Sequence, residues 1–147
     1  MLLFSEGSPT TNLSDADLAA GLISALNKLG ERKKVLIVPP DFSRFYSKAG
    51  PLACAAAVHY EENLADVLPA LGTHFPMTDD QIERMYPTVP RDRIRPHRWR
   101  EDVVTIGEVS ADFVSRATEG VWNRPWPAQL NKIVWEGGHD LILSIGQ

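Results

Sequence analysis

Two short segments of the sequence carry the side chains that could do chemistry. In the first, Asp41, Ser43 and Arg44 follow directly on the apolar run 35–38 and two prolines. An arginine at the end of a strand can hold a carboxylate through two parallel hydrogen bonds. An aspartate three residues earlier can orient that arginine or bind a substrate hydroxyl. The alternative is an exposed turn with an incidental aspartate–arginine pair, because short charged motifs are frequent.

The second segment runs from Leu71 to Thr78 and is centred on His74. Its glycine, Gly72, permits close approach of a ligand to the backbone. Imidazole is the side chain whose ordinary pKa suits proton transfer near neutral pH, so His74 is a candidate acid or base. A structural or solvated histidine is the alternative, because a catalytic histidine needs a second group beside it.

Other chemistries find no support in the residue spacing. His59 is expected to be solvated, His97 to pack locally, and His139 to lie in the turn before the last strand. The four histidines and the single Cys54 show no metal-ligand spacing, so the sequence predicts no metal site within this chain. Nucleotide-binding glycine motifs and a serine-hydrolase motif are also absent. The tryptophans are expected to pack rather than to stack on a ligand; they include Trp122, Trp126 and Trp135.

The elements that must position the two segments follow from hydrophobic periodicity and from capping residues. Apolar residues at helical spacing between Ser14 and Gly30 predict a helix, and Val35–Val38 predicts a buried central strand. A second helix is predicted from near Gly50-Pro51 to about Val67. Thr78 and Gln81 are predicted to cap a short helix. Further predictions are a strand at Val103–Gly107, a helix or a strand at Leu130–Trp135, and a buried strand at Asp140–Gly146.

This alternation predicts an α/β fold with a mainly parallel sheet flanked by helices. A chain of 147 residues with 44% hydrophobic and 23% charged residues is typical of one soluble globular domain. Its net charge of −4, without a basic stripe, argues against nucleic-acid binding, and no apolar run is long enough to span a membrane. The lone cysteine favours a cytoplasmic location. Because the chain stops just after an apolar strand, we expect a fragment of a longer protein.

Taken together, the two segments resemble the N-terminal domain of the nickel-pincer lactate racemase family. The resemblance rests on the strand, then Asp41-Phe42-Ser43-Arg44, an alanine-rich helix, and Leu71-Gly72-Thr73-His74-Phe75-Pro76-Met77-Thr78. It extends over nearly the whole chain, 1–147, through to Asp140-Leu141-Ile142-Leu143.

The resemblance implies an isomerase of two α/β domains, in which this chain supplies the substrate-binding half. His74 would take the proton of the substrate hydroxyl while hydride leaves the α-carbon. Asp41, Ser43 and Arg44 would bind a 2-hydroxy acid, with Arg44 on the carboxylate, and Thr73 would orient His74. The nickel-pincer nucleotide, its lysine and its nickel ligand would lie in the missing C-terminal domain, so the isolated chain is expected to be inactive.

Departures from the family pattern indicate a substrate other than lactate, larger or less anionic. Serine stands at position 43 where threonine is usual, Phe45-Tyr46-Ser47 follows Arg44 where proline is usual, and Phe75 replaces an arginine. Two other hypotheses remain. One is a stand-alone module that binds a small acid or a partner without catalysis. The other is a hydrolase with His74 as base, for which no nucleophile is evident.

Overall fold

The computed structural model describes residues 1–146, which form two compact units. The first unit comprises Met1–His97 and the segment from His139 onward, and the second comprises Arg98–Gly138. Each unit has its own sheet. In the described part of the chain, no helix is long and apolar enough to cross a membrane.

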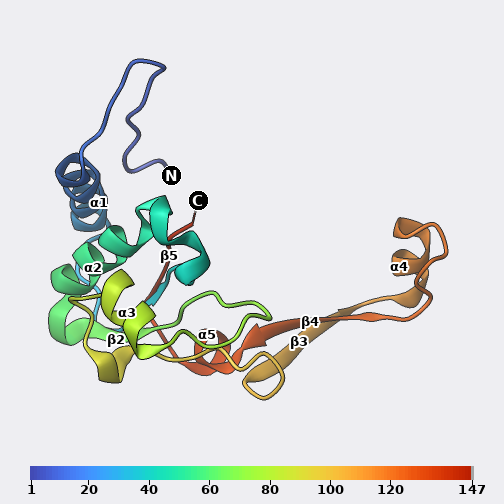
Figure 1. Ribbon diagram of the computed structural model, residues 1–147. Coiled ribbons are helices and arrows are strands. Elements are labelled where there is room, and N and C mark those ends of the chain that lie inside the picture. The colour runs from blue at the N-terminus through green and yellow to red at the C-terminus, as the bar shows by residue number, and fades with distance from the viewer. Residues whose placement is uncertain (147) are drawn as a thin grey trace. The chain divides into compact units, whose positions relative to one another are not determined.

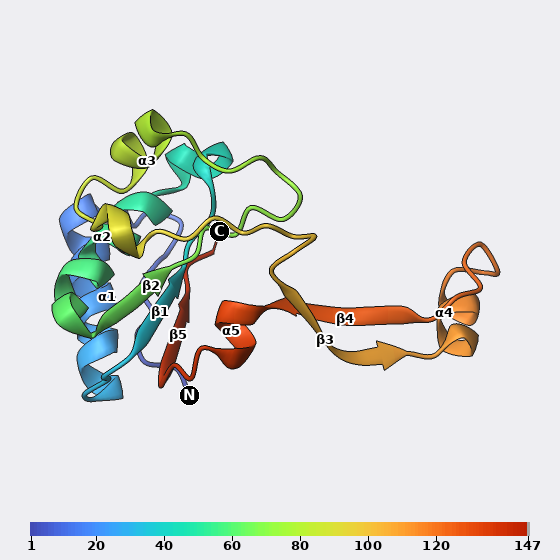
Figure 2. The same cartoon turned by 90° about the horizontal axis from the view of Figure 1, so that it is seen from below.

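The first unit, which contains β2 and β5 in Figure 1, is built on a three-stranded parallel sheet in the order β2–β1–β5, with all three strands labelled in Figure 2. These strands are β1 (Val35–Val38), β2 (Leu64–Val67) and β5 (Leu141–Ser144). The first three residues of β1 have no exposed surface, as expected for a central strand. The predicted α/β fold with a parallel sheet is therefore confirmed.

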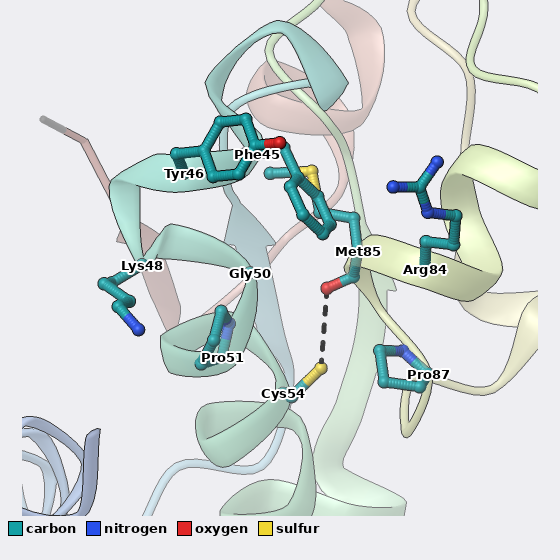
Figure 3. Close-up of a pocket in the computed structure, with 9 residues that line it drawn as sticks. All are labelled: Phe45, Tyr46, Lys48, Gly50, Pro51, Cys54, Arg84, Met85 and Pro87. Atoms are coloured by element: carbon teal, nitrogen blue, oxygen red, sulfur yellow. Dashed lines mark hydrogen bonds between the residues drawn. The ribbon is translucent and has the colours of Figure 1, made fainter.

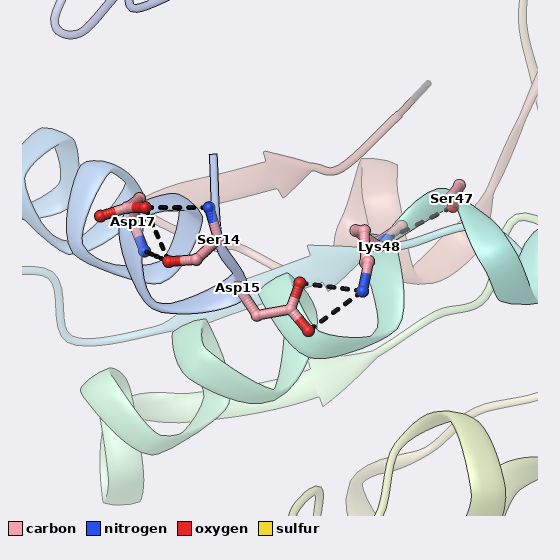
Figure 4. A network of polar contacts seen from close by, with 6 residues as sticks. Ser14, Asp15, Asp17, Ser47 and Lys48 are labelled. Atoms are coloured by element: carbon pink, nitrogen blue, oxygen red, sulfur yellow. Dashed lines mark hydrogen bonds and ion pairs between the residues drawn. The ribbon is translucent and has the colours of Figure 1, made fainter. Parts of the chain in front are cut away.

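Helices α1 (Asp15–Leu29) and α2 (Ala49–Tyr60) pack together beside this sheet (Figure 2). The predicted cap of α1 is confirmed: Ser14 accepts a hydrogen bond from the backbone of Asp17, and the Asp17 carboxylate accepts one from the backbone of Ser14. Lys48, which precedes α2, pairs with Asp15 at 2.9 Å (Figure 4). Both side chains are more than half exposed, so this ion pair contributes little to stability.

Two sequence predictions in this unit were wrong. The helix α2 ends at Tyr60 rather than near Val67, because Glu61 takes a positive φ of 44° and a short 3₁₀ turn, η2 (Glu61–Asn63), follows. The next four residues form β2, since pairing with β1 decides between helix and strand where a short apolar pattern fits both. The last strand is not fully buried either: β5 lies at the edge of the sheet, and Ile142 is 44% exposed.

The predicted cap of the third helix is confirmed. Thr78 and Gln81 form a reciprocal capping box at the start of α3 (Asp79–Met85), which buries Ile82. Besides η2, this unit has two 3₁₀ helices: η1 (Phe42–Ser47), which begins shortly after β1, and η3 (Arg91–Arg93).

The second unit is a two-stranded antiparallel ribbon with two short helices. Its elements are β3 (Val103–Val109), α4 (Ala111–Ala117), β4 (Trp126–Asn131) and α5 (Lys132–Glu136). The predicted strand at 103–107 is confirmed, and β4 is its antiparallel partner. The tryptophans of this unit do not pack in a core, because Trp122, Trp126 and Trp135 are 44%, 59% and 59% exposed.

The contact between α2 and α3 gives a first stability test. A Cβ atom at Gly50 would lie 2.7 Å from the backbone oxygen of Met85, which cannot move without shifting α3. We expect Gly50→Ala to lower the free energy of unfolding by roughly 1–3 kcal/mol, as overpacking does. The control is Gly146→Ala, because a Cβ there meets no atom within 4 Å. Equal urea midpoints for the two variants would contradict the close approach.

A second test uses His139, whose two ring nitrogens are buried and have no hydrogen-bond partner among residues 1–146. Burial, together with the charge of Lys34, lowers the pKa of His139. The unfolded chain therefore binds a proton more readily, and the free energy of unfolding should fall as the pH drops below about 6.5. We expect His139→Phe to remove part of this loss, measured by urea unfolding at pH 7.5 and 5.5. An unchanged difference between the two pH values would argue against the buried imidazole.

Candidate active site

The two chemical segments meet because the pairing of β1 and β2 continues beyond both strands. The backbone N–H of Leu68 donates to the carbonyl of Ile37 at 2.8 Å, and that of Ala70 donates to the carbonyl of Pro39 at 2.7 Å. Pro40 and Ala70 then form a parallel bridge. The turns that follow each strand therefore start side by side at the carboxyl edge of the sheet.

Asp41 and His74 are in direct contact. The Oδ2 atom of Asp41 lies 2.6 Å from Nδ1 of His74. The other carboxylate oxygen, Oδ1, accepts hydrogen bonds from the Ser43 backbone N–H at 3.1 Å and from the Ser43 hydroxyl at 2.5 Å. The Asp41 side chain is only 10% exposed, whereas that of His74 is 62% exposed. A buried carboxylate therefore holds one edge of an accessible imidazole ring.

Hydrogen bonding keeps the Asp41 carboxyl ionised. Burial acts to raise its pKa, but the hydrogen bonds from Ser43 and His74 outweigh this, and the pKa lies below its usual range. An ionised carboxylate can only accept hydrogen bonds, so the Nδ1 atom of His74 must carry the proton. The lone pair of a neutral ring then lies on Nε2. This is the arrangement in which an aspartate prepares a histidine to act as a general base.

Tyr86 is a positioning residue that the sequence analysis missed. Its side chain is 1% exposed, and its hydroxyl donates a hydrogen bond to the carbonyl of Pro40, the residue before Asp41. Burial and the nearby charge of Asp41 raise the pKa of this phenol, so the hydroxyl stays protonated and able to donate. The sequence contains one signal for this role. Tyr86 lies four residues after the inward-facing Ile82, and this helical spacing places both side chains on the same face.

Of the other predicted site residues, Ser43 bonds to Asp41, whereas Arg44 and Thr73 make no hydrogen bond or ion pair with the aspartate–histidine pair in the described part of the chain. Arg44 is exposed, and within residues 1–146 its guanidinium has no ion-pair or hydrogen-bond partner. Thr73 is also exposed and makes no hydrogen bond to His74 in the part of the chain that the structure describes. The ring is oriented by Asp41 instead, and the Ser43 hydroxyl is engaged with Asp41.

A cavity of about 380 Å³ lies between η1, the start of α2 and the end of α3 (Figure 3). Its walls include Phe45, Pro51 and Met85, and the Cys54 thiol donates a weak hydrogen bond to the Met85 carbonyl at 4.0 Å. Neither Asp41 nor His74 lines it, so the candidate chemistry lies outside this cavity.

A second cavity, of about 370 Å³, is lined in part by residues that flank His74 in sequence. These are Leu71, Pro76 and Met77. Across residues 1–146, no group of three or more histidine, cysteine, aspartate or glutamate side chains is arranged to hold a metal ion.

Comparison with known proteins gives a structural relative but no family. No protein-family model matches the chain, and no curated protein sequence matches it. A crystal structure of a Thermotoga maritima protein from the Northeast Structural Genomics Consortium matches with a TM-score of 0.75 and 27% sequence identity. The match covers 96% of this chain and 34% of that chain. The chain thus spans about a third of the protein it matches, and its α/β fold occurs there as part of a larger chain.

The aspartate–histidine contact can be tested by NMR. We expect Asp41→Asn to remove the preference of the neutral His74 ring for a proton on Nδ1, because an amide can either donate to or accept from that nitrogen. The ¹⁵N chemical shifts of the two ring nitrogens report the tautomer directly. Asp66→Asn is the control, since Asp66 pairs with Arg95 and not with a histidine. Identical ring shifts in wild type and Asp41→Asn would show that the carboxylate does not hold the ring.

Proposed function

We propose that this chain is the substrate-binding half of a 2-hydroxyacid racemase or epimerase that resembles the nickel-pincer lactate racemase family. The observation that carries the proposal is the 2.6 Å contact between Asp41 and His74, residues that come from separate segments 33 positions apart. Both segments had been identified from the sequence as candidate chemistry. A carboxylate–imidazole pair at the carboxyl edge of a parallel sheet is suited to proton transfer.

The proposed binding mode uses the free guanidinium of Arg44 to hold the substrate carboxylate. Two parallel hydrogen bonds would fix the acid in one orientation. The substrate hydroxyl would then lie against Nε2 of His74, with Thr73 beside the ring. Ser43 keeps the Asp41 carboxylate in place through its hydroxyl and backbone N–H.

In the proposed proton step, the hydroxyl O–H bond of the substrate breaks and a new N–H bond forms at Nε2. The ring becomes an imidazolium whose charge the Asp41 carboxylate stabilises across the Nδ1 contact. The resulting alkoxide loses hydride from its α-carbon more readily than the alcohol does. Loss of that hydride leaves a 2-oxo acid. The hydride would be accepted by the cofactor that the resemblance implies and returned to either face of the carbonyl carbon, and the proton on Nε2 then goes back to the oxygen.

The resemblance assigns the hydride chemistry to a nickel-pincer nucleotide. The described residues do not offer a metal-ligand cluster for it, so we assign no step of this chain to that cofactor. In the proposal, the cofactor is held by a second domain and the isolated chain is inactive. The match to a third of a longer chain supports an incomplete enzyme. We place the protein in the cytoplasm, in keeping with its single, free cysteine.

A binding experiment tests this proposal on the 147-residue chain. We expect both enantiomers of a 2-hydroxy acid such as 2-hydroxybutyrate to shift the amide resonances of Ser43, Arg44 and His74, because a racemase must accept both configurations. Arg44→Gln should weaken binding at least about tenfold, since it removes a charge-assisted hydrogen-bond pair. Arg116→Gln, on the exposed helix α4, is the matched control and should bind as wild type does.

Two outcomes of the titration would overturn the proposal. Binding of one enantiomer alone would favour the stand-alone acid-binding module. Shifts confined to the cavity around Phe45 and Met85 would place the ligand away from the aspartate–histidine pair.

A further inference from the structure

The ribbon of the second unit has one apolar face. Along β4, Trp126, Ala128 and Leu130 alternate and so point to the same side. Their partners across the ribbon are Val109, Gly107 and Val104, respectively. None of these six residues has a charged side chain, and the indole N–H of Trp126 is their one side-chain hydrogen-bonding group.

The opposite face of the ribbon is mixed: Val103 and Pro127 lie on it together with the polar residues Thr105, Gln129 and Asn131 and the charged Glu108. Gln129 pairs with Thr105 and donates a hydrogen bond to its hydroxyl at 3.2 Å, and Glu108 lies opposite Pro127. A strand pair with one apolar and one more polar face is the pattern of a sheet that has solvent on one side only.

Solvent nevertheless reaches part of the apolar face. Val109 is 37% exposed and Trp126 is 59% exposed, and Trp122, 44% exposed, packs edge-on against Trp126 with ring centres 6.4 Å apart. A Cβ atom built on Gly107 would meet no atom within 4 Å, so the centre of the face is open. Large apolar side chains that lie exposed next to one another on one face are typical of an interaction site.

A two-stranded ribbon of this kind needs a covering layer. An isolated pair of strands is marginally stable in water, and burying one apolar face against another element is what normally stabilises it. The covering surface must itself be apolar, because the face offers no charge with which a polar partner could pair.

We propose that this apolar face docks the polypeptide that supplies the other two-thirds of the fold seen in the Thermotoga maritima protein. The match covers 96% of this chain, so it includes the ribbon, and it leaves 66% of that protein's chain outside the matched region. This proposal deepens the proposed function, which requires a second domain, and it assigns the ribbon face as the surface that receives it.

The Thermotoga crystal structure allows a direct test. We expect the residues aligned with Val109, Trp126 and Leu130 to lose more than half of their exposed surface when the part of the chain outside the match is included. The residues aligned with Thr105 and Gln129 serve as the matched control and should change little. Apolar-face positions that stay exposed, or that are covered by a second copy of the chain, would overturn the proposal.

The same comparison can be made in solution with the full-length Thermotoga protein. Aspartate at the position aligned with Leu130 should lower the melting temperature by several degrees, because it places a charge in the covered interface. Aspartate at the position aligned with Gln129 should leave it within about one degree. Equal shifts for the two variants would overturn the proposal.

The 147-residue chain tests the competing occupant, a second copy. We expect a monomer in analytical ultracentrifugation, with the backbone amides of β4 exchanging rapidly with solvent. A dimer that protects β4, and that Trp126→Ser dissociates, would overturn the proposal. These measurements do not depend on hydroxy-acid binding. They can therefore contradict the docking proposal without contradicting the proposed substrate site, and the binding experiment can contradict the substrate site without contradicting the docking proposal.

Discussion

A single buried carboxylate organises the candidate site. Asp41 accepts three hydrogen bonds from two residues, and these bonds keep it ionised although it is removed from solvent. An unpaired charge in that position would be strongly destabilising, so the turn around it must keep Ser43 and His74 in place. The orientation of the imidazole ring therefore follows from the need to satisfy Asp41.

Two separate parts of the fold bring Asp41 to that position. The first is the sheet, where the backbone pairing of Pro40 with Ala70 brings two turns together that are distant in sequence. The second is the end of α3, where Tyr86 bonds to the Pro40 carbonyl. That helix end is held in turn by its close approach to Gly50 on α2. A precise site on exposed turns thus depends on a rigid support on two sides.

The sequence predicted correctly those elements that are determined by residues close together in the chain. The caps at Ser14 and Thr78 and the apolar run of β1 are examples, since each depends on neighbours a few residues away. The strand β2 was missed because its four residues suit helix and strand equally, and only pairing with β1 decides. The meeting of the two segments depends on this same strand pairing, and the Tyr86 anchor depends on distances that no spacing reveals. Likewise, residue pattern shows that the ribbon has an apolar face but not whether anything covers it.

The accessibility of His74 has a consequence for any hydrogen that passes through its ring. With 62% of the side chain open to water, a proton held on Nε2 is shared with the bulk within a very short time. In deuterium oxide, deuterium would therefore replace the hydrogen of a substrate hydroxyl whether or not a reaction followed. A hydrogen removed as hydride would keep its original isotope. If the hydrogen on the α-carbon keeps its isotope through a turnover, the site must prevent it from mixing with the hydroxyl hydrogen, which exchanges with water.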